Sequence, residues 1–483
     1  MNYISLGISP EQAEKIAREH FDVKGRATPL PGYVDCNFRL EVDAGEGYIL
    51  KVSRPDENED YVHFQQELLR HIAQKETDTI APKALNDAKG NPLTSFTDKD
   101  GRRRMVRLLT WVPGRLWSHV IPQLGALRFS LGEKCGRLTR TLQGFDHPQA
   151  YRELEWDIAR SLWTRDHLDL FDQKERQILR DFQDRFARGR VEYGVLRKAV
   201  VHNDANDNNL IVSEEPVHPT VKAVIDFGDA IHTQIINDLA IACAYAIMGQ
   251  NDPLDAALPV IRGYHSAFPL EERELEHLYA AIAMRLVVSV TKSALSKYEE
   301  PDNSYLRISE RPAWELLQKW YTINADFALY SFRQACGFEA HPRRAAFEKW
   351  AGNKAFRISE LFPTIGKDGI HPLDLSVASR WLGMQTDFDD LDLFQFKIDR
   401  LQQQHPRKII AGGYLESRTV YTTSEYGRIG NSGPEKRTLH LGTDFWLPAG
   451  TAVHALFDGE VVTSVNDTGD KEYGGLIILK HTT

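Results

Sequence analysis

The spacing of hydrophobic residues changes along the chain and separates a short strand-rich region from a longer helical one. Residues 10–21 carry apolar side chains at helical intervals. Ser9 and Gln12, at the start of this segment, have the spacing of a capping box. Over residues 25–116 the pattern becomes that of short strands and turns, interrupted by one helix over 64–72. We therefore predict a small N-terminal lobe built around a sheet.

Helical spacing prevails over residues 122–336. Apolar side chains recur every three or four positions in the segments 124–142, 175–186 and 271–296. A strand-rich island over 199–227 interrupts this pattern. A strand-rich lobe followed by a larger helical lobe predicts the α+β class, with a cleft between the two lobes.

The hydrophobic pattern changes again beyond residue 340. The segment 341–407 has the pattern of a helical linker, and short strands over 408–483 predict a small all-β module. The expected domains are therefore an N-lobe over 1–116, a C-lobe over 117–340, the linker and the all-β module.

Composition narrows the class of protein. The 483 residues are 42% hydrophobic and 26% charged, as in soluble globular proteins. The sequence has no run of about 18 apolar residues and no secretory signal, which argues against a membrane protein. Four widely spaced cysteines indicate reduced thiols and a cytoplasmic location. The net charge of −9 argues against non-specific nucleic-acid binding and is compatible with a cationic substrate.

The strand-rich island carries the side chains with the clearest chemistry. His202-Asn203-Asp204 is followed by Asn209, and Asp226 in Ile225-Asp226-Phe227-Gly228 ends the next apolar run. Phosphoryl transfer needs one carboxylate facing the acceptor hydroxyl, and a carboxylate with an amide to hold Mg²⁺. We assign the first role to Asp204, the metal to Asn209 and Asp226, and support of the loop to His202. Each piece alone is a common turn, but the ordered set favours a kinase.

This order resembles the aminoglycoside-phosphotransferase and choline-kinase superfamily, whose loop reads His-Gly-Asp or His-Asn-Asp and ends on an Asn five residues after the Asp. Asp238, in Asp238-Leu239-Ala240, matches a helix-anchoring residue of the family. The resemblance covers about residues 8–336. It implies a two-lobed protein-kinase-like fold that uses ATP or GTP with Mg²⁺.

The resemblance also assigns nucleotide contacts in the first lobe. Lys51 matches the strand lysine that contacts the phosphates, and Glu67 matches the helix glutamate that pairs with it. The segment 31–37, which contains Asn37, fills the position of the phosphate loop. The hinge that would bind the purine through its backbone consists of Leu109, Thr110, Trp111 and Val112.

Within the superfamily, the segments 106–115 and 206–212 look like those of hydroxylysine kinases. The implied substrate is a small amino alcohol or hydroxylated amino acid that carries an ammonium group. Asp207 is a candidate to hold that cation, and a solvent-facing turn is the alternative role for this residue.

The segment 439–453 resembles the lysostaphin-type zinc peptidases and implies His440 and Asp444 as zinc ligands. A catalytic zinc needs three protein ligands, and the later His-x-His of the family does not occur before residue 483. We therefore expect an incomplete zinc site in a peptidase-like module or a scaffold without hydrolysis. The order of domains is similar to proteins that continue into a class III aminotransferase-like domain, so a further C-terminal domain is expected.

These patterns together predict a small-molecule kinase. It would transfer the γ-phosphate of ATP or GTP to the hydroxyl of an amino alcohol or hydroxylated amino acid, without nucleic acid or membrane as partners. The alternative is a zinc peptidase-like or scaffold protein whose kinase-like domain binds nucleotide without catalysis.

Overall fold

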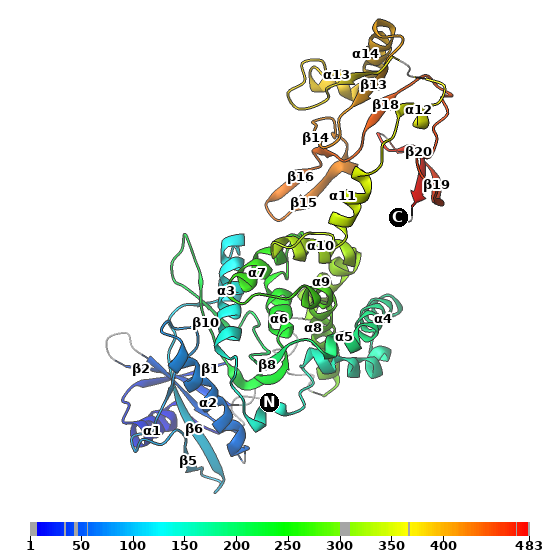
Figure 1. The fold of residues 1–483 in the computed structure, drawn as a ribbon. Coiled ribbons are helices and arrows are strands. Elements are labelled where there is room, and N and C mark those ends of the chain that lie inside the picture. The colour runs from blue at the N-terminus through cyan, green and yellow to red at the C-terminus, as the bar shows by residue number, and fades with distance from the viewer. Residues whose placement is uncertain are drawn as a thin grey trace. The chain divides into compact units, whose positions relative to one another are not determined.

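The computed structural model describes residues 7–32, 35–42, 47–55, 57–299, 310–365, 368–469 and 471–481. The chain divides into two compact units, residues 1–341 and 342–483 (Figure 1). In the first unit a strand-rich lobe precedes a helical lobe, so the predicted α+β class is confirmed.

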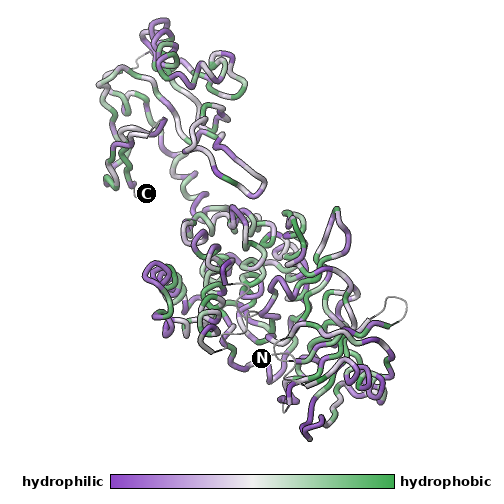
Figure 2. The backbone as a smooth tube through the Cα atoms, turned by 180° about the vertical axis from the view of Figure 1, so that it is seen from behind, coloured by the Kyte–Doolittle hydropathy of each residue, from purple (hydrophilic) through white to green (hydrophobic). Residues whose placement is uncertain are grey.

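The strand-rich lobe is an antiparallel sheet in the order β1-β2-β3-β6-β4, with β5 also paired to β6. Helix α1 begins with the predicted capping box between Ser9 and Gln12, and its Ala13 and Ile16 pack in one core with Leu50 of the sheet. Hydrophobic and hydrophilic positions along this lobe are visible in Figure 2. Its elements are α1 (Pro10–Phe21), β1 (Arg26–Leu30), β2 (Cys36–Glu41), β3 (Gly47–Val52), α2 (Glu59–Lys75), β4 (Ala84–Leu85), β5 (Thr94–Thr97) and β6 (Arg103–Thr110).

The helical lobe contains two small sheets that carry the predicted catalytic segments, β10-β9-β7 and β11-β8. Its elements are β7 (Arg115–Leu116), η3 (Trp117–His119), α3 (Gly125–Thr141), η4 (Pro148–Tyr151), η5 (Ile158–Leu170), α4 (Gln173–Arg188), α5 (Arg190–Gly194), β8 (Lys198–Val201), β9 (Leu210–Val212), β10 (Val221–Val224), η6 (Phe227–Asp229), β11 (Ile231–Gln234), α6 (Ile236–Ala246), α7 (Pro253–Ala267), α8 (Glu272–Glu299), α9 (Glu310–Thr322) and α10 (Ala325–Ala335).

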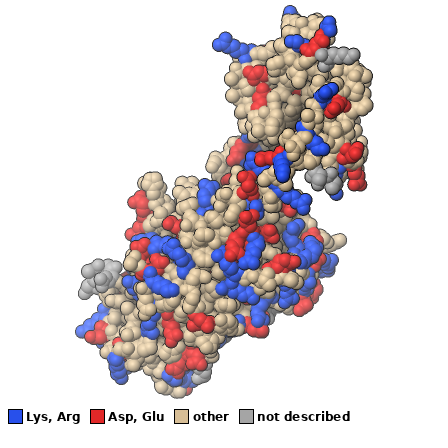
Figure 3. All heavy atoms as spheres, in the orientation of Figure 1, with Lys and Arg blue, Asp and Glu red and all other residues tan. Residues whose placement is uncertain are grey.

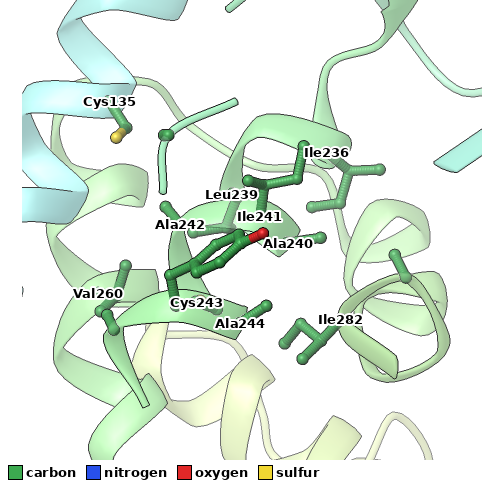
Figure 4. Close-up of a cluster of buried hydrophobic side chains, with 14 of the residues drawn as sticks. Cys135, Ile236, Leu239, Ala240, Ile241, Ala242, Cys243, Ala244, Val260 and Ile282 are labelled. Carbon is green, nitrogen blue, oxygen red and sulfur yellow. The ribbon is translucent and has the colours of Figure 1, made fainter. Parts of the chain in front are cut away.

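Helix α6 forms the centre of the helical lobe, because all of its residues are buried. Figure 4 shows its side chains beside Cys135 of α3, Val260 of α7 and Ile282 of α8, which belong to the same core. Helix α8 is long and apolar enough over Glu272–Lys297 to cross a membrane, but 83% of its apolar window is buried inside the structure. That burial is typical of a core helix.

The second unit has its own core and does not follow the predicted division at residue 407. Strand β12 lies before that position and β13 after it, yet the two pair in parallel, and Leu373 shares a core with Ile398 and Ile410. The elements are α11 (Arg344–Gly352), α12 (Ile358–Leu361), β12 (Ile370–Leu373), α13 (Gln385–Asp389), α14 (Leu391–Gln404), β13 (Ile409–Gly412), β14 (Glu416–Ser417), η8 (Ser424–Tyr426), β15 (Gly427–Gly430), β16 (Gly433–Lys436), β17 (Leu439–His440), β18 (Asp444–Trp446), β19 (Glu460–Asp467) and β20 (Gly474–Lys480).

The surface charges are mixed in sign. On the face shown in Figure 3, basic and acidic side chains are interspersed over both units. On this face the acidic side chains are therefore distributed among basic ones rather than collected in one patch.

Candidate active site

A cavity of about 1080 Å³ is lined by residues from both lobes of the first unit. Small-molecule sites occupy about 300–1,000 Å³, so this volume is sufficient for a nucleotide together with a small acceptor. Of the residues predicted for the kinase site, the cavity is lined by Asn37, Lys51, Leu109, Thr110, Trp111, Val112, Asp204, Asn209 and Asp226.

The loop that follows β8 is held by a carboxylate from α6. Asp238 accepts hydrogen bonds from the backbone N–H groups of His202 at 3.1 Å and Asn203 at 2.7 Å. Asn203 has φ of 64°, in the left-handed region that Gly and Asn adopt more readily than other residues. This geometry explains why Gly or Asn precedes the aspartate in the motif.

His202 supports the loop from within the core. Its Nδ1 accepts the backbone N–H of Asp204 at 3.2 Å, which leaves the proton on Nε2 to donate to the carbonyl of Ile225 at 3.0 Å. The ring also meets the edge of Phe227, with centroids 4.6 Å apart. Burial lowers the pKa of His202, which favours this neutral tautomer.

Asp204 lies at the centre of a polar network. Its Oδ1 accepts from Nη2 of Arg285 at 2.6 Å, and its Oδ2 accepts from the amides of Asn206 at 2.9 Å and Asn209 at 2.8 Å. Burial raises the pKa of Asp204, and the Arg285 guanidinium opposes that rise. Burial raises the pKa of the neighbouring Asp229 as well.

The candidate metal ligands are Asn209 and Asp226. The Nδ2 group of Asn209 donates to both the carbonyl and Oδ2 of Asp204, so its amide oxygen is the atom left for a cation. The Asp226 side chain is 48% exposed and faces Lys51 at 3.4 Å, and this charge lowers the pKa of Asp226. Among the described residues, no three or more His, Cys, Asp or Glu side chains are grouped to hold a metal. One carboxylate and one amide still fit Mg²⁺, which is usually completed by phosphates and water.

Three polar residues form a row across the sheet of the first lobe. Asn37, Lys51 and Arg107 are direct partners on β2, β3 and β6, and all three line the cavity. The Oδ1 atom of Asn37 is buried without a hydrogen-bond partner. Residues 33 and 34 of the predicted phosphate loop lie outside the described residues.

The structure corrects the predicted pairing of Lys51 with Glu67. Lys51 faces Asp35 at 3.7 Å, and Asp35 also accepts from Arg107 at 2.6 Å. Glu67 is 55% exposed and lies 3.8 Å from His147. The residue of α2 that contacts this row is Gln65, whose side-chain oxygen accepts a hydrogen bond from Arg107. Positions 65 and 67 are about 200° apart on a helix, so they occupy opposite faces.

The predicted hinge follows β6, and part of its backbone is already bonded within the protein. The N–H of Thr110 donates to Lys83 at 3.0 Å, and the N–H of Trp111 donates to Gly47 at 3.0 Å. These two groups are therefore unavailable to a purine. The amide of Val112 is the next donor along the hinge.

Sequence reasoning missed Arg285, which contacts Asp204, and Trp156 and Tyr245, whose rings contact Arg285. The Arg285 guanidinium lies 4.7 Å from the Trp156 ring centroid and 5.5 Å from that of Tyr245. No local motif marks these residues, because they come from different elements. Asp229 had a local signal, since it directly follows Asp226-Phe227-Gly228.

The predicted zinc ligands lie together in the second unit. His440 Nε2 is 3.4 Å from Asp444 Oδ1, while Asp444 Oδ2 accepts from Arg418 at 2.6 Å. His481, the other histidine matched to that family, contacts the carbonyl of Asp458. Within the described part of this unit, no third ligand joins the pair.

Two known proteins with similar sequences are kinases, in agreement with the geometry of the site. A hydroxylysine kinase of Danio rerio is 28% identical over 316 residues, which cover 62% of this chain and 87% of that protein. A hydroxylysine kinase of Mus musculus is 24% identical over 339 residues, which cover 65% and 89%.

Two solved structures have the same fold at low sequence identity. An amicoumacin kinase in complex with AMP-PNP, Ca²⁺ and Ami has a TM-score of 0.52 and 16% identity, covering 67% of this chain and 99% of that chain. A microcompartment-associated aminopropanol kinase has a TM-score of 0.50 and 18% identity, covering 68% and 99%. The predicted two-lobed kinase fold is thus confirmed.

The family itself is identified by a match over residues 26–277, a little more than half of the chain. The prediction of an enzyme, a phosphotransferase with an alcohol group as acceptor, is confirmed at this level. The chain belongs to the phosphotransferase enzyme family.

Proposed function

We propose that this chain transfers the γ-phosphate of ATP or GTP to the hydroxyl of an amino alcohol or a hydroxylated amino acid. The observation that carries the proposal is that Asp204, Asn209, Asp226 and Lys51 all line one cavity. Two relatives are hydroxylysine kinases, and one protein of similar fold is an aminopropanol kinase. Both names support a substrate that carries a hydroxyl and an amine.

Asp204 acts on the acceptor in this proposal. Its carboxylate orients the hydroxyl and accepts its proton as the phosphoryl group is transferred. The contact with Arg285 keeps the carboxylate ionised and in one orientation. Asp207 and Asp229 also line the cavity and are the candidates to bind the ammonium group of the acceptor.

The nucleotide binds the opposite side of the cavity. Asn209 and Asp226 hold Mg²⁺, which neutralises charge on the phosphates when it is bound. Lys51 contacts the phosphates, and Asn37 lies beside it on the neighbouring strand of the cavity wall. The amide of Val112 bonds the purine edge.

A substrate screen tests this function. Nucleotide consumption would be measured with ATP and with GTP on hydroxylysine, homoserine, ethanolamine, choline and 1-amino-2-propanol, with an Asp204→Ala variant as control. We expect turnover of at least one compound, and a loss of about 10²–10⁴-fold in the variant. Turnover of none of them above the control would reject the proposal.

We propose that the second unit is a peptidase-like module without zinc-dependent hydrolysis. The support is Arg418, whose positive charge lies 2.6 Å from the Asp444 carboxylate and opposes a divalent cation there. Metal analysis of the purified protein and of a His440→Ala variant tests this. Stoichiometric zinc that is lost in the variant would contradict it.

The cysteines support a cytoplasmic location for this enzyme. Cys36, Cys135, Cys243 and Cys336 are all buried and unpaired. Unpaired thiols are typical of proteins in reducing compartments. Localisation of a tagged full chain would test the assignment, and recovery from an oxidising compartment would contradict it.

A further inference from the structure

One face of helix α8 connects the catalytic carboxylate to a second charged group in the cavity. Arg285, Ser289 and Lys292 are four and three positions apart, so they lie on one side of the helix. Arg285 reaches Asp204, Ser289 meets the hydroxyl of Tyr245 at 3.4 Å, and Lys292 comes next. Seven helical residues span about 10 Å, so the backbone positions of Arg285 and Lys292 are about that far apart along α8.

Lys292 forms an ion pair that is open to the cavity. Its Nζ donates to the carboxylate of Glu155 and lies 5.2 Å from the ring centroid of Trp163. Lys292 is 28% exposed and Glu155 is 65% exposed. Ion pairs with this exposure contribute little to stability. A positive and a negative group therefore stand side by side on the cavity wall without being needed to hold the fold.

A second glutamate, Glu310, also lines the cavity, and its carboxylate already has two hydrogen-bond partners. Glu310 accepts from Ser293 at 3.0 Å and from the ammonium of Lys297. The Glu310 side chain is 19% exposed, less than a third of the exposed fraction of Glu155. Glu155 is therefore the better placed of the two carboxylates to exchange a partner.

We propose that Lys292 and Glu155 bind the head group of a hydroxylated α-amino acid. Lys292 binds the α-carboxylate, Glu155 binds the α-ammonium, and the Trp163 ring covers this end of the cavity. This assignment rests on the proposed kinase function and narrows its substrate class. An amino alcohol has no carboxylate for Lys292, so the pair distinguishes amino acids from amino alcohols.

The length of the site accommodates a hydroxyl several carbons away from the head group. An extended chain advances about 3.5 Å for every three bonds, so six bonds from hydroxyl oxygen to carboxylate oxygen span about 7 Å. A hydrogen bond of about 2.8 Å at each end extends the reach to about 13 Å. This reach is sufficient for the spacing of about 10 Å between the backbone positions of Arg285 and Lys292 along α8.

The test compares two acceptors in the full chain. Hydroxylysine has the α-amino acid head, and 1-amino-2-propanol has an amine and a hydroxyl without a carboxylate. For Lys292→Met we expect KM for hydroxylysine to rise about 10- to 100-fold with little change in kcat, because an interaction with a charged group is lost from binding alone. KM for 1-amino-2-propanol stays unchanged, and Lys292→Arg restores most of the hydroxylysine affinity.

A control lies on helix α9. Lys319 donates to the carbonyl of Gln250 and does not line the cavity, so Lys319→Met should leave both KM values unchanged. If Lys292→Met changed KM equally for both acceptors, or changed it for neither, the assignment would be overturned. Wild-type turnover of 1-amino-2-propanol but not of hydroxylysine would also overturn it, while the kinase function would stand.

A binding measurement separates this assignment from the kinase function. Hydroxylysine is titrated calorimetrically into the wild type and Lys292→Met, each with AMP-PNP and Mg²⁺. Binding that is weakened in the variant supports the head-group site even if no acceptor is phosphorylated, in which case only the kinase function fails. Equal affinity in both proteins, or no binding to the wild type, rejects the site.

Discussion

Arg285 donates from Nη2 to Oδ1 of Asp204 over 2.6 Å, across a separation of 81 positions in the sequence. The Arg285 side chain is only 2% exposed, and Asp204 is 20% exposed. Burial favours the protonated form of the carboxyl, whereas the guanidinium favours the ionised form. The arginine therefore sets the pH at which the proposed base becomes active.

The first prediction concerns the pH dependence of the wild type. The pKa of Asp204 is raised to about 6, mainly by burial. The ionised form is the active one, so kcat/KM should fall as the pH drops through about 6 and level off above it. An initial-rate profile from pH 5 to 8 checks this. A profile that stays flat down to pH 5 would show that Asp204 does not control the rate.

The second prediction concerns Arg285→Met. Loss of the guanidinium removes the charge that lowers the pKa of Asp204, so the acid limb should move to higher pH and kcat at neutral pH should fall at least about tenfold. Arg285→Lys retains the charge and should keep the limb closer to that of the wild type. A lower rate without movement of the limb would mean that Arg285 acts only on structure.

The parts of the site that depend on local sequence could be predicted. His202, Asp204 and Asn209 lie in one loop, and hydrogen bonds between neighbours in the sequence position them. Arg285 and Asp35 could not be found in this way. Each reaches the site through contacts between distant segments, and Arg285 lies in an apolar helix whose pattern predicts a core element.

The error over Glu67 has a related physical cause. A motif gives the position of a helix along the chain, but the orientation of the helix decides which face meets the sheet. Here Gln65 turns inward and Glu67 outward. The fold class was easier to predict, because it depends on the period of many hydrophobic positions and not on the direction of one side chain.

The third prediction compares Asp35, which faces Lys51, with Glu67, which does not. Asp35→Asn removes the buried charge between Lys51 and Arg107, so it should lower the free energy of unfolding by about 3 kcal/mol and raise KM for the nucleotide. Glu67→Gln is the control and should change stability by less than about 0.5 kcal/mol. Urea unfolding and nucleotide titration measure both effects. The opposite ranking would restore Glu67 as the partner of Lys51.

The fourth prediction concerns the left-handed backbone at Asn203. Its side-chain atoms are buried without hydrogen-bond partners, so Asn203→Gly removes no hydrogen bond and should leave stability almost unchanged. Asn203→Val places a β-branched residue at φ of 64° and should destabilise the protein by at least about 1–2 kcal/mol. Chemical denaturation of the two variants distinguishes these outcomes, and equal stability would contradict the backbone argument.

The last prediction concerns the close packing of α3 against α7, which supports the core below the catalytic loop. A Cβ added to Gly132 would lie 1.8 Å from the carbonyl oxygen of Val260, and one added to Gly263 would lie 2.0 Å from that of Phe129. Because backbone atoms cannot rotate away, Gly132→Ala should lower the free energy of unfolding by about 1–3 kcal/mol. Gly194→Ala is the matched control, since its added Cβ has no neighbour within 4 Å and alanine is the better helix former. Thermal unfolding should place Gly132→Ala well below the wild type and Gly194→Ala at or slightly above it. A stable Gly132→Ala variant would mean that the two helices can separate without loss, and that their contact is not what fixes this part of the core.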